Sequence, residues 1–412
     1  MPERNHLLQR LRVTSVIASL TAGGIGPVCR YAAEGMAKLT DWQVTLLSLH
    51  DPVDEFTQET SGLRIVCLGL NGDCARQFLQ WLANDPQDLV ITSDVCHIEP
   101  AFRFLPARTL HIVQIHDSSK RYREGAVRHS ACIDGVTCVG KHIEEPLKRS
   151  LAEVAYRGLL RTVHNGASFP PTKPRESHGG PLRLLFMGRV EPLKGVFDLV
   201  PLLLQLQRWR VTSTLNLVGG ENAELRKKFQ RKGLEGSVTW SGLVPHARCY
   251  DIAAESDLLL MPTRKESFGM VTIEAMSMGC VPIAYDIPSG SVEIIEPDKN
   301  GLLVPLGDIR AWAEEIRNIH YDRKRLAKLS VAAVARARSA FSADTMARNM
   351  VAFLSAVIVS ARIFPAVRES GMPSAGDKKL NRGYHRLPSG LREWIRNQVH
   401  AHPKISHWLL SR

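Results

Sequence analysis

The chain has 412 residues, which is too long for one hydrophobic core and suits two domains of ordinary size. Hydrophobic residues make up 44% and charged residues 23%, a balance typical of a soluble globular protein. The net charge is +12, but residues 362–412 hold ten Lys or Arg against three acids, and no aromatic and basic residues alternate along the domains. This distribution argues against a nucleic-acid-binding protein.

We expect neither a signal peptide nor a membrane-spanning helix. Residues 1–12 are polar and basic, and the longest apolar run, Met350–Ala361, is shorter than the roughly 20 residues that cross a bilayer. We therefore expect a cytoplasmic protein. The eight cysteines form no C-x-x-C pair, which predicts reduced, buried thiols and neither a disulfide framework nor a zinc site.

The first predicted strand, Val13–Leu20, leads into a glycine loop and then a helix from Val28 to Leu39. The loop glycines are Gly23, Gly24 and Gly26. Glycine lets a phosphate or sugar approach the backbone, so the loop is a candidate ligand site. An ordinary strand-to-helix turn explains the same residues, because the dinucleotide-binding spacing is absent.

Alternating strands and helices continue through the first half of the chain. The further strands are predicted at Val44–Leu49, Leu63–Leu68, Leu89–Ser93, His111–Ile115, Gly135–Val139 and Arg161–Val163. Such repetition predicts a parallel sheet covered by helices. Two of these strands end in polar residues, His116 and Asn165, at the edge where ligands of such sheets bind.

A Pro- and Gly-rich stretch, Phe169–Pro181, separates this half from a second alternation. Its strands are predicted at Leu182–Met187, Thr214–Val218, Val238–Ser241, Asp257–Met261, Val281–Tyr285 and Gly301–Val304. We therefore predict a first domain at residues 1–170, a linker at 171–181 and a second domain at 182–341.

The stretch Pro262–Pro282 carries two carboxylates after a buried strand. Glu266 lies in a polar loop and Glu274 in an apolar, methionine-rich helix that ends near Gly279. A strand, loop and helix N-terminus in this order direct free backbone N–H groups toward an anion. A buried glutamate needs a partner, so Glu274 either forms a structural salt bridge or a cap with Ser267, or accepts hydrogen bonds from sugar hydroxyls.

Arg189 and Lys194 follow the strand Leu182–Met187 in the segment GRVEPLKG. Arginine can bind phosphate oxygens through two hydrogen bonds and lysine adds a point charge, so the pair suits a diphosphate. The alternative is a pair of solvated surface cations.

These two motifs together resemble those of the retaining GT-B glycosyltransferases of family 4, also called group 1. The resemblance rests on Gly-Arg-x4-Lys-Gly and on E-x7-E with Ser-Phe-Gly-Met after its first glutamate, and it extends over about Val13–Ile319. It implies two Rossmann-like, doubly wound α/β domains facing a cleft. It also implies transfer of a sugar from a nucleoside-diphosphate sugar to an acceptor hydroxyl with retention of configuration.

The resemblance also implies roles for individual residues. Arg189 and Lys194 would hold the diphosphate, Glu274 the ribose, and Glu266 the donor sugar, while His116 would lie near the reacting carbon. Gly23, Gly24 and Gly26 would let the acceptor or a phosphate approach the first domain. The remaining donor-binding residues implied are Gly188, Gly219, Gly220, Val244, Ser267, Phe268, Gly269, Met270 and Val271.

No cofactor or metal ion is expected, because the chain lacks the D-x-D pair of metal-dependent glycosyltransferases and the two cations can neutralise the phosphates. We assign no general base. Two other functions are considered: a GT-B nucleotide-sugar epimerase, which would turn over donor without acceptor, and a non-catalytic basic binding protein.

The C-terminal residues extend beyond the family pattern. A helix at residues 342–364 is predicted to cross back to the first domain, as in similar proteins, followed by a flexible segment and a basic tail within 365–412. Leu391, Trp394 and Ile395 fall on one face of a helix in this tail, which suits either an anionic membrane surface or the protein's own surface. The acceptor would be a carbohydrate or a lipid-linked sugar, used in polysaccharide or glycolipid assembly at the inner face of a membrane.

Overall fold

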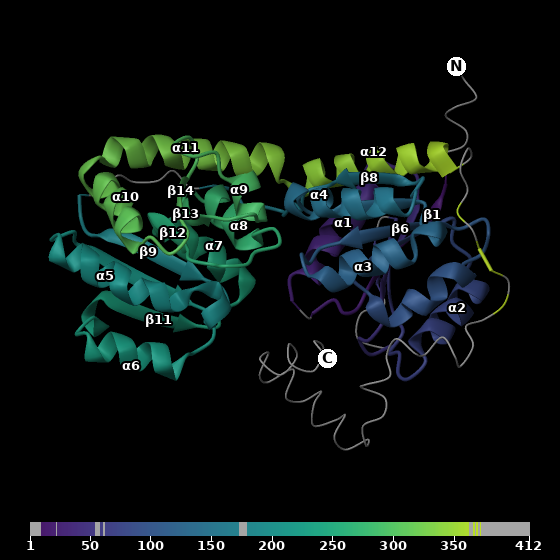
Figure 1. Cartoon of the computed structure of the whole chain (residues 1–412), viewed down its shortest axis with the longest axis horizontal. Coiled ribbons are helices and arrows are strands. Elements are labelled where there is room, and N and C mark those ends of the chain that lie inside the picture. Colours follow the sequence, from purple (N-terminus) through teal and green to yellow (C-terminus); the bar gives the residue numbers. More distant parts are fainter. Residues whose placement is uncertain are drawn as a thin grey trace.

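The computed structural model arranges the chain in two α/β domains that lie side by side (Figure 1). The structure describes residues 10–21, 23–53, 58–60, 62–172, 179–361, 366, 368, 369 and 371. Each domain contains one sheet with helices packed against it. The predicted fold class, two α/β domains built from alternating strands and helices, is confirmed.

The first domain contains an eight-stranded sheet in the order β3-β4-β2-β1-β5-β6-β7-β8. Its strands are β1 (Arg12–Ile17), β2 (Gln43–Ser48), β3 (Gln58–Thr60), β4 (Leu63–Cys67), β5 (Leu89–Ser93), β6 (Leu110–Ile115), β7 (Gly135–Cys138) and β8 (Leu159–Thr162). All neighbours are parallel except β3, which is antiparallel to β4. The short β3 was not predicted, because three residues are too few for a periodic signal.

The helices of the first domain connect these strands. They are α1 (Ile25–Leu39), α2 (Cys74–Asn84), the 3-10 helix η1 (Cys96–Phe104), α3 (Lys120–Arg128), the 3-10 helix η2 (Ser130–Cys132) and α4 (Lys141–Glu153). Helix α1 begins at Ile25, three positions before the predicted start, so the glycine loop is shorter than expected.

The second domain has a six-stranded, fully parallel sheet in the order β11-β10-β9-β12-β13-β14. Its strands are β9 (Leu182–Met187), β10 (Ser213–Val218), β11 (Val238–Gly242), β12 (Leu258–Met261), β13 (Val281–Asp286) and β14 (Leu302–Pro305). Its helices are η3 (Pro192–Lys194), η4 (Val196–Asp198), α5 (Leu199–Arg208), α6 (Ala223–Arg231), η5 (Glu235–Ser237), α7 (His246–Glu255), α8 (Met270–Ser277), α9 (Gly290–Ile294), α10 (Ile309–Tyr321) and α11 (Arg323–Ala340).

The long helix α11 is absent from the predicted elements. Its buried face consists largely of small residues, such as Ala333 and Ala337, so the apolar stripe is weak in the sequence. An aspartate, Asp322, caps its N-terminus by accepting a hydrogen bond from the Arg325 N–H at 2.8 Å. The helix packs against α8, the helix that carries Glu274.

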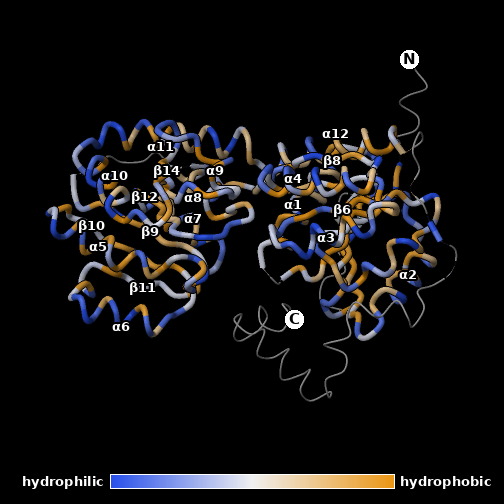
Figure 2. Tube along the Cα trace, viewed as in Figure 1, coloured by the Kyte–Doolittle hydropathy of each residue, from blue (hydrophilic) through white to orange (hydrophobic). Residues whose placement is uncertain are grey.

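Apolar residues concentrate along the strands and the inner faces of the helices, whereas the outer helix α6 carries many hydrophilic residues (Figure 2). Strand β5 is buried over its whole length, as expected for a central strand covered on both faces. Burying one Leu or Ile side chain contributes about 1.5–3 kcal/mol, so these layers supply much of the stability of each domain.

The last long helix, α12 (Ala343–Ala361), packs on α1 of the first domain, as the predicted crossover requires (Figure 1). The two helices approach closely at Gly35, where an added Cβ would lie 2.3 Å from the Cβ of Ala347. Only glycine therefore fits at this crossing.

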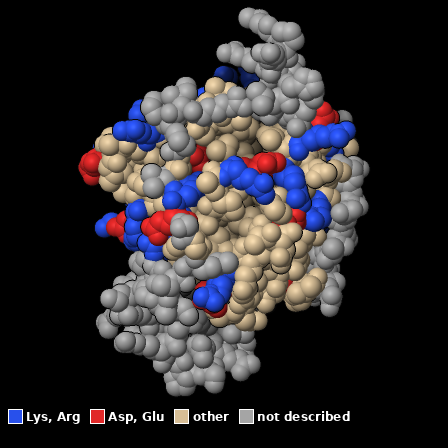
Figure 3. Space-filling model, turned by 90° about the vertical axis from the view of Figure 1, so that its right-hand side faces the viewer, with Lys and Arg blue, Asp and Glu red and all other residues tan. Residues whose placement is uncertain are grey.

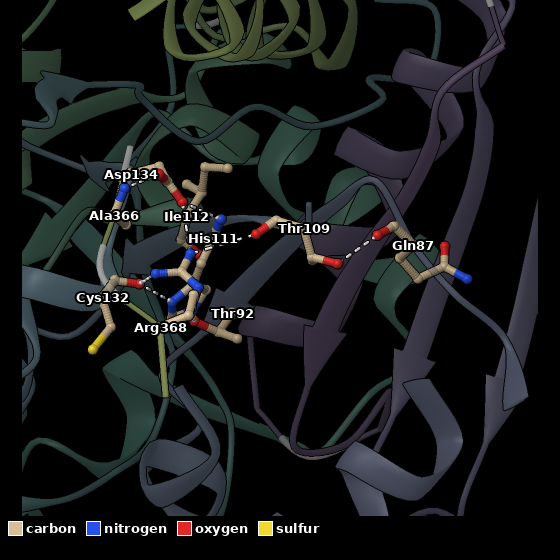
Figure 4. Close-up of polar contacts among 9 residues, drawn as sticks. All are labelled: Gln87, Thr92, Thr109, His111, Ile112, Cys132, Asp134, Ala366 and Arg368. Carbon is tan, nitrogen blue, oxygen red and sulfur yellow. Dashed lines mark hydrogen bonds and ion pairs between the residues drawn. The ribbon is translucent and has the colours of Figure 1, made fainter. Parts of the chain in front are cut away.

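Two of the few described residues after α12, Ala366 and Arg368, contact the first domain within the segment predicted to be flexible. Arg368 is 7% exposed and donates to the Asp134 carboxylate at 2.8 Å and to the Cys132 carbonyl at 2.7 Å (Figure 4). The Ala366 N–H donates to the same carboxylate at 3.3 Å. Burial of the neighbouring His111 ring, and to a lesser extent the positive charge of Arg368, lower the pKa of His111 to about 3. The predicted tail helix at residues 387–399 lies outside the described residues.

Candidate active site

A cavity of about 320 Å³ opens between the two domains at the carboxyl ends of β6, β9 and β12. This is the edge where ligands of doubly wound sheets bind. Its lining residues are Gly24, Ile25, His116, Asn165, Phe186, Met187, Gly188, Arg189, Lys194, Met261, Pro262, Thr263, Glu266, Ser267, Phe268, Gly269, Met270 and Val271.

The segment after β9 brings both predicted cations to this cavity. The Arg189 side chain is 61% exposed and pairs with Glu191 at 3.2 Å, while Lys194 Nζ lies 2.8 Å from Glu266 Oε2. The turn is fixed by Gly195, whose φ is +70° and whose added Cβ would lie 1.7 Å from the Pro262 carbonyl oxygen. Any other residue there would push the loop off the strand.

The N-terminus of α8 forms another part of the cavity wall. Gly269, with φ +102°, precedes the helix, and Met270 and Val271 begin it. The first N–H groups of a helix have no acceptor within the helix, and the helix dipole makes this end partly positive. Two cations and a helix N-terminus therefore face one cavity, which is an arrangement suited to a bound anion.

Glu274 does not line the cavity, although it lies on the same helix face as Met270, one turn further along. Its residue is 9% exposed, and its Oε1 lies 2.9 Å from Nε2 of His246, the first residue of α7. The hydrogen bond to Glu274 raises the pKa of His246. The carboxylate thus has the partner that its burial requires, and this partner was not predicted.

His116 lies at the end of β6, in the cavity wall, and is 6% exposed. Burial lowers the pKa of its imidazole to about 4, so the ring is neutral at pH 7. The Asp94 carboxylate holds the backbone here by accepting hydrogen bonds from the backbone N–H groups of His116, at 3.2 Å, and Asp117, at 2.9 Å. Burial raises the pKa of Asp94 well above its usual value.

The glycine loop reaches the cavity through Gly24, but Gly23 and Gly26 do not line it. Gly26 instead lies against the Leu20 carbonyl, where an added Cβ would be 2.3 Å from the oxygen. The strand end before this loop is held by Asp51, which accepts hydrogen bonds from the backbone of Leu20 and from two serine hydroxyls. These bonds outweigh burial and lower the pKa of Asp51.

Three further predicted residues lie outside the cavity lining. Gly219 packs against the carbonyl of Gly188, and neither Gly220 nor Val244 contributes to the wall. The cavity is also lined by residues that were not predicted: Ile25, Phe186, Met187, Met261, Pro262 and Thr263. Most of them are apolar ends of strands or residues directly after them, so position after a strand is the only signal for them in the sequence.

The two domains touch beside the cavity. The backbone N–H of Ser118 donates to Ser267 Oγ at 3.1 Å, and Lys265 Nζ lies 3.6 Å from Asp117 Oδ1. Among the described residues, no group of three or more His, Cys, Asp or Glu side chains is placed to hold a metal ion. No helix in the described part of the chain is both long and apolar enough to cross a membrane.

The second domain is similar to known proteins in sequence. Residues 172–336 match the family model described as Glycosyl transferases group 1. The chain is 30% identical over 189 residues to the D-inositol 3-phosphate glycosyltransferase of Jonesia denitrificans, a match that covers 44% of each chain. It is 25% identical over 192 residues to the GDP-mannose:cellobiosyl-diphosphopolyprenol alpha-mannosyltransferase of Xanthomonas campestris, covering 44% of this chain and 50% of that one. The chain thus spans half or less of the length of these relatives.

Solved structures share the whole two-domain arrangement. Sucrose-phosphate synthase from Thermosynechococcus elongatus superposes with a TM-score of 0.72 at 19% identity, covering 85% of this chain and 100% of that one. HepE from Anabaena, solved with UDP and glucose, superposes with a TM-score of 0.65 at 18% identity, covering 84% and 100%. The predicted GT-B fold is confirmed by these likenesses.

Proposed function

We propose that the protein is a retaining glycosyltransferase, because residues 172–336 match the family model described as Glycosyl transferases group 1. The donor is a nucleoside-diphosphate sugar and the acceptor is a hydroxyl of a carbohydrate or a lipid-linked sugar. The names of the relatives support the reaction class, and the UDP in the HepE structure supports a nucleotide-sugar donor.

One observation carries the proposal: Arg189, Lys194 and the N-terminus of α8 face a single cavity between the domains. In the proposed complex, the diphosphate lies among these groups, because they supply positive charge and free backbone N–H donors. Glu266 hydrogen-bonds the donor sugar, and Glu274 hydrogen-bonds the ribose further along the same helix.

The chemistry follows from where charge develops. As the glycosidic bond breaks, negative charge builds on the leaving diphosphate and positive charge on the sugar ring. Lys194, held in the wall, stabilises the leaving group without reorganising, which lowers the barrier. His116 is neutral, so it can form a hydrogen bond with a sugar hydroxyl without repelling a cationic ring. We propose that this charge neutralisation needs no metal ion.

The acceptor would enter from the first domain, beside Gly24 and His116. A lipid-linked acceptor would give the basic tail, residues 365–412, a role at an anionic membrane surface. Residues 372–412, which make up most of this tail, lie outside the described structure.

The test is an assay with a panel of nucleoside-diphosphate sugars, each incubated with simple sugar acceptors, with and without EDTA. We predict release of one nucleoside diphosphate, unaffected by EDTA, and a product whose anomeric configuration by NMR matches that of the donor. Inversion, or loss of activity in EDTA that Mg²⁺ restores, would overturn the retaining or metal-independent part. Conversion of the donor sugar without any acceptor would indicate an epimerase.

A further inference from the structure

A row of buried polar side chains connects His116 to the interior of the first domain. His116 Nε2 lies 3.7 Å from Cys29 Sγ, and Cys29 Sγ lies 3.5 Å from Ser93 Oγ. Ser93 Oγ in turn donates to Gln114 Oε1 at 3.3 Å. Cys29 belongs to α1, Ser93 to β5 and Gln114 to β6, and each of the three is at most 3% exposed.

The protons in this row can be counted. Ser93 has one hydroxyl proton and donates it to the amide oxygen of Gln114, so toward Cys29 it can only accept. Cys29 has one thiol proton and donates it to Ser93, while the hydroxyl of Ser15, its other hydrogen-bond partner, can donate to the sulfur. Its sulfur can then only accept from His116, which requires a proton on Nε2.

The ionisation states agree with this count. Burial raises the pKa of the Cys29 thiol to about 12 and lowers that of His116 to about 4, so both groups are uncharged at pH 7. A neutral imidazole carries one N–H and one lone pair. With the proton on Nε2, the lone pair is on Nδ1, which makes no hydrogen bond within the described part of the chain.

We propose that Cys29 is a positioning residue that fixes His116 in the tautomer with Nε2 protonated. His116 then presents Nδ1 as an acceptor to a hydroxyl of the sugar bound in the cavity. The functional part rests on the proposed glycosyl transfer, whereas the tautomer is a property of the unliganded protein. The tautomer assignment and the role in sugar transfer can therefore be tested, and can fail, separately.

The tautomer is read by NMR from the ¹⁵N shifts of the histidine rings in the full chain, with the His116 signal assigned by its loss in His116→Gln. We predict protonated Nε2 in the wild-type protein and in Cys29→Ser, because a serine hydroxyl can still accept from the ring and donate to Ser93. In Cys29→Ala the acceptor is gone, and we predict a mixture of both tautomers. The control is Cys138→Ala, which removes another fully buried thiol of the same domain and should leave the His116 signal unchanged.

Ser93→Ala provides a second variant in case Cys29→Ala does not fold. Without Ser93 the thiol proton can point at His116 as well as at Ser15, so the tautomers should again mix. Protonated Nδ1 in the wild-type protein would overturn the proposal. So would an unchanged tautomer in both folded Cys29→Ala and folded Ser93→Ala.

Transfer kinetics then test the role in the reaction. Cys29→Ala should lower kcat about tenfold while leaving the Kd for the nucleoside diphosphate unchanged, and Cys29→Ser should restore kcat. Unchanged kcat in Cys29→Ala, with its tautomers mixed, would overturn the positioning role. If the wild-type protein holds the predicted tautomer but transfers no sugar from any donor, the proposed function fails and the tautomer assignment stands.

Discussion

Lys194 and Glu266 are paired at 2.8 Å in the absence of a ligand, and both side chains are largely buried. A diphosphate would compete with Glu266 for the lysine. The carboxylate therefore holds the cation in place before the donor binds, but it also opposes the binding of another anion nearby.

This pairing gives Glu266→Ala an unusual predicted phenotype. The freed Lys194 should bind a nucleoside diphosphate at least as tightly as in the wild-type protein, because a competing anion is removed. Sugar transfer should nevertheless fall by about tenfold or more, because the contact to the donor sugar is lost. Calorimetric titration and steady-state kinetics measure the two effects, with Glu235→Ala, an exposed carboxylate in the same domain, as the control. Weaker nucleotide binding together with unchanged transfer would contradict the assignment.

At the residue scale, the sequence predicts which residues lie together in one loop better than it predicts which distant residues their side chains contact. Gly188, Arg189 and Lys194 were predicted together and lie together, because they share one short segment after one strand. The partner of Glu274 could not be predicted, because His246 lies on another helix, 28 residues away in the chain. The row from Cys29 to Gln114 joins three elements and gives no local signal.

At the element scale, helix α9 joins the two domains through one carboxylate. Glu293 accepts hydrogen bonds from the backbone and ring of His142 in α4, at 3.2 and 3.1 Å, and from His164 Nε2 after β8, at 2.8 Å. Burial alone would raise the pKa of Glu293, but these bonds outweigh it and hold the pKa far below its ordinary value of 4.5. The contact comes from three distant segments, so the sequence did not predict it.

Glu293→Gln should therefore destabilise the protein in a pH-dependent way. At pH 7 we predict a loss of about 1–3 kcal/mol in the free energy of unfolding, as for hydrogen bonds to a charged group. A depressed carboxyl pKa stabilises the folded state above the unfolded pKa, and this stabilisation is lost as the pH falls. The difference from wild type should thus shrink below about pH 4.5. Urea unfolding from pH 7 to pH 3 measures it, with the exposed Glu145→Gln of α4 as the control. A difference that is constant across this range would contradict the account.

At the scale of the whole molecule, the βα repetition was enough to predict two doubly wound domains, because periodicity and glycine turns are local properties. The contacts that place one domain against the other, such as Lys265 with Asp117, are not local and were not predicted. On the visible part of the face at the first-domain end, basic side chains lie beside acidic ones (Figure 3). This mixture agrees with a charge excess that belongs mostly to the C-terminal residues.

The central claim is that the cavity between the domains binds a nucleoside diphosphate through Lys194. It is tested most directly by calorimetric titration of the full chain with UDP, GDP, ADP and dTDP. Three proteins are compared: the wild type, Lys194→Ala and Lys227→Ala, the last of which removes an exposed lysine of α6 from the same domain. We predict that one nucleotide binds the wild type and Lys227→Ala equally, and binds Lys194→Ala at least about tenfold more weakly. Binding of no nucleotide, or equal binding by all three proteins, would contradict the claim.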